Sequence, residues 1–267
     1  MTQLEKKTPK DHALENYIAD NPERQLGDRW VAMKNALTRA GHGLSLSEKR
    51  LVMLALSSLD SKATYIIGQV PTSRVTAADY AELYDVDPNT AYDQLQAAAK
   101  ALYNRSITIF EHSAKRKGRS LNSTIRTDMR WVGRCKYHEG EGWVELGWWP
   151  ELMPYVSKVV RGNFTSYQLK QASALRSVHS WRLLELLLRF ESTGWAEYTI
   201  EDFATSMDAT EKQRENFNNI KRRIIEPAIK ELTEKDGWII DWLPIKAGRR
   251  VAKLCLLYTS PSPRDRT

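Results

Sequence analysis

The chain has 267 residues and carries 40 Lys and Arg against 33 Asp and Glu, a formal net charge of +7. This length suits one large domain or two of moderate size, and we expect two. No segment approaches the roughly 20 apolar residues of a membrane span, and no apolar signal segment opens the chain, so we expect a cytoplasmic protein with no membrane partner. The cationic excess favours a polyanionic partner.

The two cysteines, Cys135 and Cys255, are far apart and form no CxxC motif. They therefore predict neither a zinc site nor a disulfide framework. We expect no metal and no cofactor, although Asp85, Asp87 and His138 are candidate metal ligands.

Residues 1–27 are rich in Lys, Asp, Pro and Asn and predict a flexible arm. The first helix is predicted to begin in "SLSEKRLVMLALSSL", where Ser45 and Glu48 form an S-x-x-E capping box before an apolar run.

A short helix is then predicted through residues 77–84, followed by a longer helix that starts at "DPNTAYDQLQAAAKAL". Asp87 is its expected N-cap and Pro88 its first residue. The pair Asp85 and Asp87 is interpreted as a turn and a cap rather than as metal ligands.

The segment "SITIF" predicts a strand, and residues 113–134 predict a basic loop with seven Lys or Arg against the single Asp128. After it, "CKYHEGEGWVELGW" predicts a hairpin that turns at residues 139–142. His138 is expected to be an exposed turn residue, and Trp131, inside the basic loop, is a candidate for stacking on a base.

A second set of elements follows in the same order. The helix in "SVHSWRLLELLLRFE" is apolar nearly all round, so we expect it to be buried between the two halves. A short helix in "TIEDFATSM" and a long helix over residues 216–232 come next, and the strands "GWIIDWL" and "RVAKLCLLY" flank the loop "PIKAG".

An internal match supports this parallel. "VTAADYAELYDVD" aligns without gaps with "YTIEDFATSMDAT" 123 residues later, which places Thr76 opposite Thr199 and Asp85 opposite Asp208. The offset then becomes 130, so the second copy has seven extra residues, about "EKQRENF", before its long helix. Helix, short helix, turn, helix and β-hairpin is the winged-helix arrangement.

We therefore predict a helix-rich α+β fold of two tandem winged-helix domains. The first domain is expected over residues 28–165 and the second over 166–257. Residues 258–267 are predicted to be a disordered or foreign tail.

The long helix of the second copy is the predicted DNA-reading element. Asn216, Asn219, Arg222 and Arg223 lie opposite its apolar face. Arg and Asn can make bidentate contacts to guanine and adenine edges in the major groove. An ordinary solvated face remains the alternative.

Pro227 lacks an N–H group, so we expect it to kink or split this helix near Arg223. The wing after it turns at Gly248. The expected phosphate contacts of this domain are Arg214, Lys221, Lys246, Arg249, Arg250 and Lys253, with Lys221 in a supporting role on the apolar side of the helix. Phosphate contacts that do not depend on DNA sequence are expected in the first domain from Asn89, Thr90, Gln94, Arg105, Lys115, Arg116, Lys117, Arg119 and Arg126.

At "LRSVHSWRLLELLLRFESTGW", "FNNIKRRIIEPAIKEL" and "PIKAGRRVAKL", and over residues 35–256 in general, the sequence resembles the replication initiator proteins of iteron-containing, theta-replicating plasmids. The resemblance implies a bacterial protein whose monomer binds directly repeated iterons, melts the origin and recruits the host initiator and replicative helicase. It also implies a dimer that represses its own gene at an inverted repeat, and a first domain that supplies backbone contacts and the dimer interface.

The end of the chain departs from this pattern. "CLLYTSPSPRDRT" resembles translated sequencing-adapter sequence, so residues from about Cys255 are expected to be foreign.

Two other functions are compatible with a protein that binds plasmid DNA. A rolling-circle nickase needs a metal-binding His-x-His pair, which the sequence lacks, and no nucleotide-binding or hydrolase motif is present, so we expect no enzyme activity. The remaining alternative is a dimeric winged-helix transcription regulator with no role at an origin.

Overall fold

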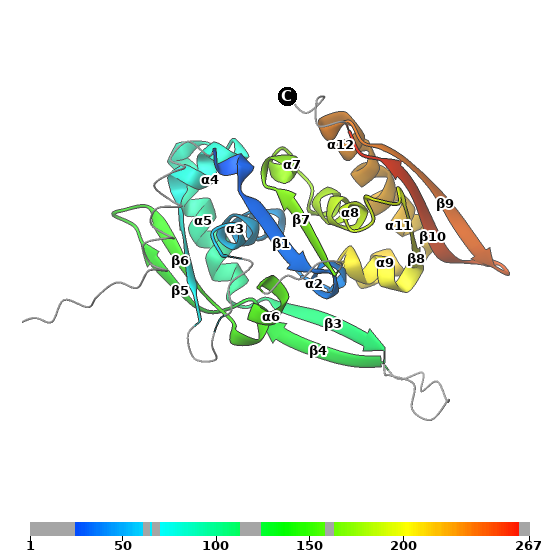
Figure 1. Ribbon diagram of the computed structural model, residues 1–267, viewed down its shortest axis with the longest axis horizontal. Coiled ribbons are helices and arrows are strands. Elements are labelled where there is room, and N and C mark those ends of the chain that lie inside the picture. The colour runs from blue at the N-terminus through cyan, green and yellow to red at the C-terminus, as the bar shows by residue number, and fades with distance from the viewer. Residues whose placement is uncertain (1–24, 61–64, 66–69, 113–123, 158–162, 262–267) are drawn as a thin grey trace, which may run out of the picture.

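The computed structural model describes residues 25–60, 65, 70–112, 124–157 and 163–261. Two α+β units lie side by side, with a pair of strands between them, and the helix α8 (Val178–Leu188) of the second unit faces the first (Figure 1). Their buried apolar side chains form one continuous core that runs through both units. No helix among the described residues is long and apolar enough to cross a membrane.

The first unit is a winged helix built from three helices and a three-stranded antiparallel sheet in the order β2-β6-β5. Its helices are α3 (Leu46–Leu56), α4 (Ala77–Tyr84) and α5 (Pro88–Leu102), and its strands are β2 (Thr72–Thr76), β5 (Val132–His138) and β6 (Trp143–Trp148). The Ser45–Glu48 capping box is present, as predicted.

Local signals also place the other ends of these elements. Asp85 takes the left-handed conformation, with φ of 51°, and ends α4. Asp87 accepts the backbone N–H of Asn89 at 2.9 Å and caps α5, whose first residue is Pro88. The β5–β6 hairpin turns between His138 and Trp143, as predicted. Both aspartates are therefore turn and cap residues.

A second hairpin corrects the predicted basic loop. Strand β3 (Ser106–His112) pairs with β4 (Thr124–Arg130), so the stretch after residue 123 is strand rather than loop. Trp131, predicted as a base-stacking candidate, is fully buried, and its indole N–H donates to the carbonyl of His42 at 3.4 Å. That prediction is wrong, because the ring is part of the core.

The strand pair between the units joins segments far apart in the chain. Strand β1 (Trp30–Lys34) pairs antiparallel with β7 (Phe164–Gln168), so the domain boundary predicted at residue 165 falls inside a paired strand. Leu26 is buried in the short 3-10 helix η1 (Leu26–Asp28), so the predicted arm extends too far. Residues 1–24 lie outside the described part of the chain. Short elements complete this region: α2 (Asn35–Arg39), η2 (Pro150–Leu152), α6 (Met153–Val156) and α7 (Lys170–Ser173).

The second unit repeats the same plan around the sheet β8-β10-β9. It contains the helices α8, α9 (Ile200–Ser206), α10 (Glu211–Arg214), α11 (Phe217–Ile220), the π-helical turn η3 (Lys221–Ile225) and α12 (Glu226–Asp236), and the strands β8 (Trp195–Thr199), β9 (Ile239–Ala247) and β10 (Arg250–Thr259). Four leucines of α8 are completely buried, as the sequence predicts. Removing one of them to Ala costs about 2–5 kcal/mol in such a core.

Structure and sequence agree on the repeat. Thr76 caps α4 by accepting the N–H of Asp79, and Thr199 caps α9 by accepting the N–H of Asp202, both at 3.0 Å. Asp208 has a φ of 52°, matching its counterpart Asp85. The predicted α+β fold with two winged helices is confirmed.

The end of the second unit corrects another prediction. Strand β10 continues to Thr259 as the central strand of its sheet, and the Tyr258 side chain is buried with its hydroxyl donating to Leu187 O at 2.8 Å. The tail is predicted to begin at residue 258, but residues 258 and 259 are still part of β10, so any tail begins after Thr259.

Candidate nucleic-acid interface

The helix predicted to read DNA is assembled from several short pieces. The first four of the seven extra residues of the second repeat form α10, which a capping box between Thr210 and Gln213 starts. A break at Glu215 follows, and Asn216 then caps α11 by accepting the N–H of Asn219 at 3.0 Å. Sequence pattern alone did not predict α10, although Thr210 and Gln213 carry the T-x-x-Q signal for it.

The predicted kink at Pro227 takes the form of a change in hydrogen bonding. The helix widens into the π turn η3, in which the Glu226 N–H bonds to the Lys221 carbonyl five residues earlier. Pro227 then lies in the first turn of α12, where a missing N–H is tolerated. Helix α11, η3 and α12 therefore run on without a gap in the chain.

The four predicted base readers divide into two pairs. Asn216 and Asn219 are engaged locally, the first as a cap and the second by donating from Nδ2 to the Lys212 carbonyl at 2.9 Å. Arg222 and Arg223 lie on η3, are exposed, and have no ion-pair partner among the described residues. Only the two arginines present free donor groups, and base reading by all four stays a prediction.

The helix is fixed against the wing through Trp242 of β9. The Trp242 ring lies 6.0 Å from the Phe217 ring between centroids, and the Lys221 ammonium lies 5.6 Å from the Trp242 centroid. Lys221 also pairs with Glu226 at 3.5 Å. This agrees with the supporting role predicted for Lys221, because its charge is directed at neighbours within the unit.

The wing turn presents cations without local partners. Gly248 has a φ of 63°, which glycine adopts readily, and an added Cβ would meet nothing within 4 Å. Lys246, Arg249 and Arg250 are exposed around this turn and have no ion-pair partner in the described part of the chain. Lys253, farther along β10, is paired with Glu197 at 2.7 Å and is less available.

Arg214 has a structural role in addition to its predicted phosphate contact. Its Nε donates to the Ala209 carbonyl at 2.8 Å, and both terminal nitrogens lie 3.3 Å from the Thr205 hydroxyl. These bonds tie α10 to α9. Arg214 is still exposed, and its contact with a phosphate stays a prediction.

In the first unit, several of the side chains predicted to contact phosphates form hydrogen bonds or ion pairs within the protein. Asn89, Thr90 and Gln94 are exposed at the start of α5 but bond to Asp87 and to one another. Arg105 pairs with Glu48 at 3.0 Å. Arg126 lies on β4, pairs with Asp128 at 3.0 Å, and is not a loop residue. Lys115, Arg116, Lys117 and Arg119 lie outside the described residues.

A cationic surface of the first unit was missed. Arg74, Arg134 and Lys136 on neighbouring strands of the sheet β2-β6-β5 surround Glu145 at 3.5–3.6 Å. The Arg74 guanidinium also lies 4.0 Å from the Trp143 ring centroid. Side chains two residues apart in a strand lie on the same face, so the predicted hairpin already indicates that Arg134 and Lys136 share a face.

The side chains that can bind metals are scattered over the described part of the chain. No group of three or more His, Cys, Asp and Glu within the described ranges could hold a metal ion. His138 is exposed, stacks on Trp143 and accepts the Glu141 N–H at 3.0 Å, which is the turn role predicted for it.

Two tandem winged helices, of which the second carries free cations on its long helix and its wing, define a DNA-binding protein of the winged-helix class. A family described as "Initiator Replication protein, WH1" matches residues 30–188, and "Initiator Rep protein, WH2" matches residues 199–256. The chain belongs to this family of replication initiator proteins. Because the first match ends at residue 188, it includes α8, which the internal repeat groups with the second unit.

Relatives agree with this assignment. The chain is 28% identical over 213 residues to an uncharacterized 27.6 kDa protein of Escherichia coli, covering 77% of this chain and 85% of that protein. It is 24% identical over 247 residues to the PI protein of Escherichia coli, covering 84% of this chain and 80% of that protein. The crystal structure of the Pi initiator protein in complex with iteron DNA matches with a TM-score of 0.70 and 22% identity, covering 88% of this chain and 99% of that one. Because the two chains are only 22% identical, this structural match supports the fold alone.

Proposed function

We propose that this protein initiates plasmid replication by binding directly repeated iterons at the origin. The observation that carries the proposal is the set of exposed cations without ion partners among the described residues. They lie on the π turn and the wing of the second unit: Arg222, Arg223, Lys246, Arg249 and Arg250. Arginines on the helix suit base edges and those on the wing suit phosphates. Membership of the initiator family supports a replication role.

The proposal also gives the first unit two roles, in DNA binding and in dimer formation. It adds phosphate contacts that do not depend on sequence, from the segment that includes Lys115, Arg116, Lys117 and Arg119, and it forms the dimer interface. The dimer represses the protein's own gene at an inverted repeat. The monomer, at the origin in the bacterial cytoplasm, promotes melting of the DNA and recruits the host initiator and replicative helicase, without cleaving DNA itself.

The second candidate is a dimeric winged-helix regulator with no role at an origin. The same fold and the same cations suit either function, so the arrangement of the DNA sites decides. Direct repeats of about 20 base pairs beside an AT-rich segment favour initiation, whereas a lone inverted repeat favours regulation.

The test is footprinting on the DNA of the plasmid that encodes the chain. We expect protection of each direct repeat and, at higher occupancy, permanganate reactivity in the adjoining AT-rich segment. Protection of a single inverted repeat alone would contradict the initiator function and favour the regulator. Site-specific nicking in the presence of Mg²⁺ would contradict the proposal that the protein is not an enzyme.

A further inference from the structure

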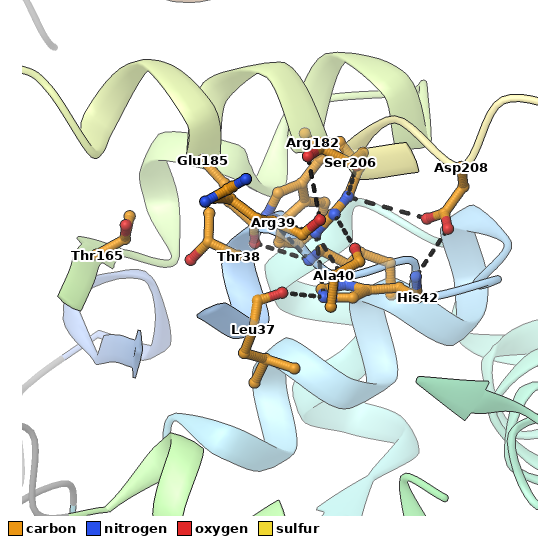
Figure 2. Close-up of polar contacts among 12 residues, drawn as sticks. Leu37, Thr38, Arg39, Ala40, His42, Thr165, Arg182, Glu185, Ser206 and Asp208 are labelled. Atoms are coloured by element: carbon orange, nitrogen blue, oxygen red, sulfur yellow. Dashed lines mark hydrogen bonds and ion pairs between the residues drawn. The ribbon is translucent and has the colours of Figure 1, made fainter. Parts of the chain in front are cut away.

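A buried polar cluster joins the two units where α2, α8 and α9 meet (Figure 2). The Arg182 guanidinium, on α8, is inaccessible to solvent. Its Nη2 donates to the Ala40 carbonyl at 2.6 Å, and its Nε donates to the Ser206 carbonyl at 2.7 Å. Ala40 follows α2 in the first unit and Ser206 ends α9 in the second, so one side chain links both.

Asp208 forms a second link at the same place. Its Oδ1 accepts the backbone N–H of His42 at 2.7 Å and that of Gly43 at 3.0 Å. Those two residues lie in the turn just before α3 of the first unit. A carboxylate at the end of α9 thus holds the start of the first unit's leading helix (Figure 2).

Charges within the cluster are paired. Glu185 of α8 accepts from Lys49 of α3 at 2.7 Å and from Arg182 at 3.2 Å. The His42 ring lies between Leu37 O, 2.8 Å from Nε2, and Arg182 Nη1, 3.0 Å from Nδ1. Burial and the nearby Arg182 lower the pKa of His42, so the ring is neutral and can donate to the carbonyl while it accepts from the guanidinium.

The repeat supplies an internal comparison for these links. Asp85 is the counterpart of Asp208, and Arg50 and Arg182 each lie five residues after the capping serine of their helix. Arg50 donates to the Leu175 carbonyl at 3.3 Å, and Asp85 lies 3.4 Å from Arg176, both just before α8.

The two sides of this junction differ in strength. The Asp85 side chain is 97% exposed, whereas that of Asp208 is 18% exposed, and the Asp208 bonds are shorter. Exposed pairs contribute little, whereas buried hydrogen bonds to a charged group are among the stronger ones. The junction is therefore tight at Asp208 and Arg182 and looser at the Asp85 carboxylate, where the nearby Arg176 is held instead by donating from Nη1 to the Tyr84 carbonyl at 2.9 Å.

We propose that Asp208 and Arg182 are positioning residues that hold the two winged helices at one separation and so fix the spacing of the DNA segments that the protein accepts. The inference rests on the proposed DNA-binding function. A rigid junction makes engagement of the second unit effectively intramolecular at one spacing, and a loosened junction lowers that advantage and tolerates other spacings.

The first test measures the junction without DNA. Spin labels are placed at Ala97→Cys on α5 and Lys235→Cys on α12, two exposed positions, after Cys135→Ser and Cys255→Ser. Asp208→Gly keeps the positive φ and removes the carboxylate, so we expect a broader distribution of label distances. Asp85→Gly is the matched control and should leave the distribution narrow. An unchanged distribution in Asp208→Gly would overturn the proposal.

The second test uses duplexes that carry one iteron with zero, one or two base pairs inserted at its centre. The full-length protein should lose most of its affinity with each insertion, and so should Asp85→Gly. Asp208→Gly should bind the native site on the order of tenfold more weakly and discriminate less among the three duplexes. Equal discrimination by Asp208→Gly and the unaltered protein would overturn the role in spacing.

Asp208→Asn guards against a folding defect. Its amide oxygen can accept both N–H bonds and Asn tolerates a positive φ, so this variant should restore the narrow distribution and the strict spacing. If it fails while the far-ultraviolet dichroism is native, the hydrogen bonds are not the cause and the proposal is wrong. Absence of iteron binding by the unaltered protein would instead contradict the proposed function, and the label distances would still test the junction.

Discussion

At the scale of single residues, free charge separates the candidate DNA contacts from the rest. Arg222 and Arg223 have no ion partner in the described part of the chain, and we expect Arg222→Ala and Arg223→Ala each to cost about 1–3 kcal/mol in discrimination between the iteron and random duplex. Lys230→Ala is the control, because Lys230 is exposed one helix further on and pairs with Glu234 at 3.8 Å. Competition titrations measure both affinities, and an equal loss on both duplexes would mean contact with phosphates only.

His42 provides a second prediction at this scale. Its pKa is lowered in the folded state by burial and by the facing charges of Arg182 and Lys49. As pH falls below about 6.5, the unfolded chain binds a proton here that the folded chain does not, so the free energy of unfolding falls by up to about 1.4 kcal/mol per pH unit. His179, whose pKa is also lowered by burial, adds a change of the same sign.

Urea unfolding at several pH values between about 7.5 and 5 measures this dependence. His42→Gln keeps a donor and an acceptor but cannot be protonated, so its pH dependence should be flatter than that of the unaltered protein. A His42→Gln protein with the full acid sensitivity would contradict the assignment.

At the scale of elements, the π turn η3 determines how the two arginines predicted to read DNA are oriented. Because Pro227 offers no N–H, the helix widens at η3, and that widening sets the direction in which Arg222 and Arg223 project. Pro227→Ala supplies the missing donor and permits regular α-helical bonding. We expect thermal stability to be retained and iteron discrimination to fall, because the two arginines rotate relative to α12. Unchanged discrimination would show that the π turn has no role in recognition.

Local signals predicted most elements, and non-local contacts explain the failures. Caps at Ser45, Thr199 and Asp87 act within one turn of chain, so the sequence pattern predicts them correctly. The pairing of β1 with β7 joins residues more than 120 positions apart, and no local signal indicates it. The burial of Trp131 likewise depends on the distant His42 turn. In the candidate site, the residue types were predictable, but the bond from the Asn219 side chain to the Lys212 carbonyl depends on α10, which the sequence pattern did not predict.

At the scale of the whole molecule, the two winged helices share one core and a buried polar junction, so they present their basic surfaces as one body. The long helices α5 and α12 lie in separate halves of the molecule (Figure 1). The second unit contributes the free arginines, whereas the polar residues at the start of α5 are engaged with one another. This division favours specificity in the second unit and DNA-backbone affinity in the first.

Salt dependence tests that division. If Lys246, Arg249 and Arg250 of the wing each neutralise one phosphate, they contribute about 3 to the slope with which the logarithm of the binding constant falls with the logarithm of the salt concentration. If the first unit also contacts phosphates, the slope measured for the unaltered protein should exceed the contribution of the second unit alone. Replacing Lys115, Arg116 and Lys117 together by Gln should then lower the slope by about one unit or more and weaken binding to specific and random duplexes alike. Replacing Arg249 and Lys246 by Gln should lower the slope in the same way. Arg222→Ala should instead change the ratio of specific to random affinity. An unchanged slope in the triple variant would show that Lys115, Arg116 and Lys117 contact no phosphate in the complex.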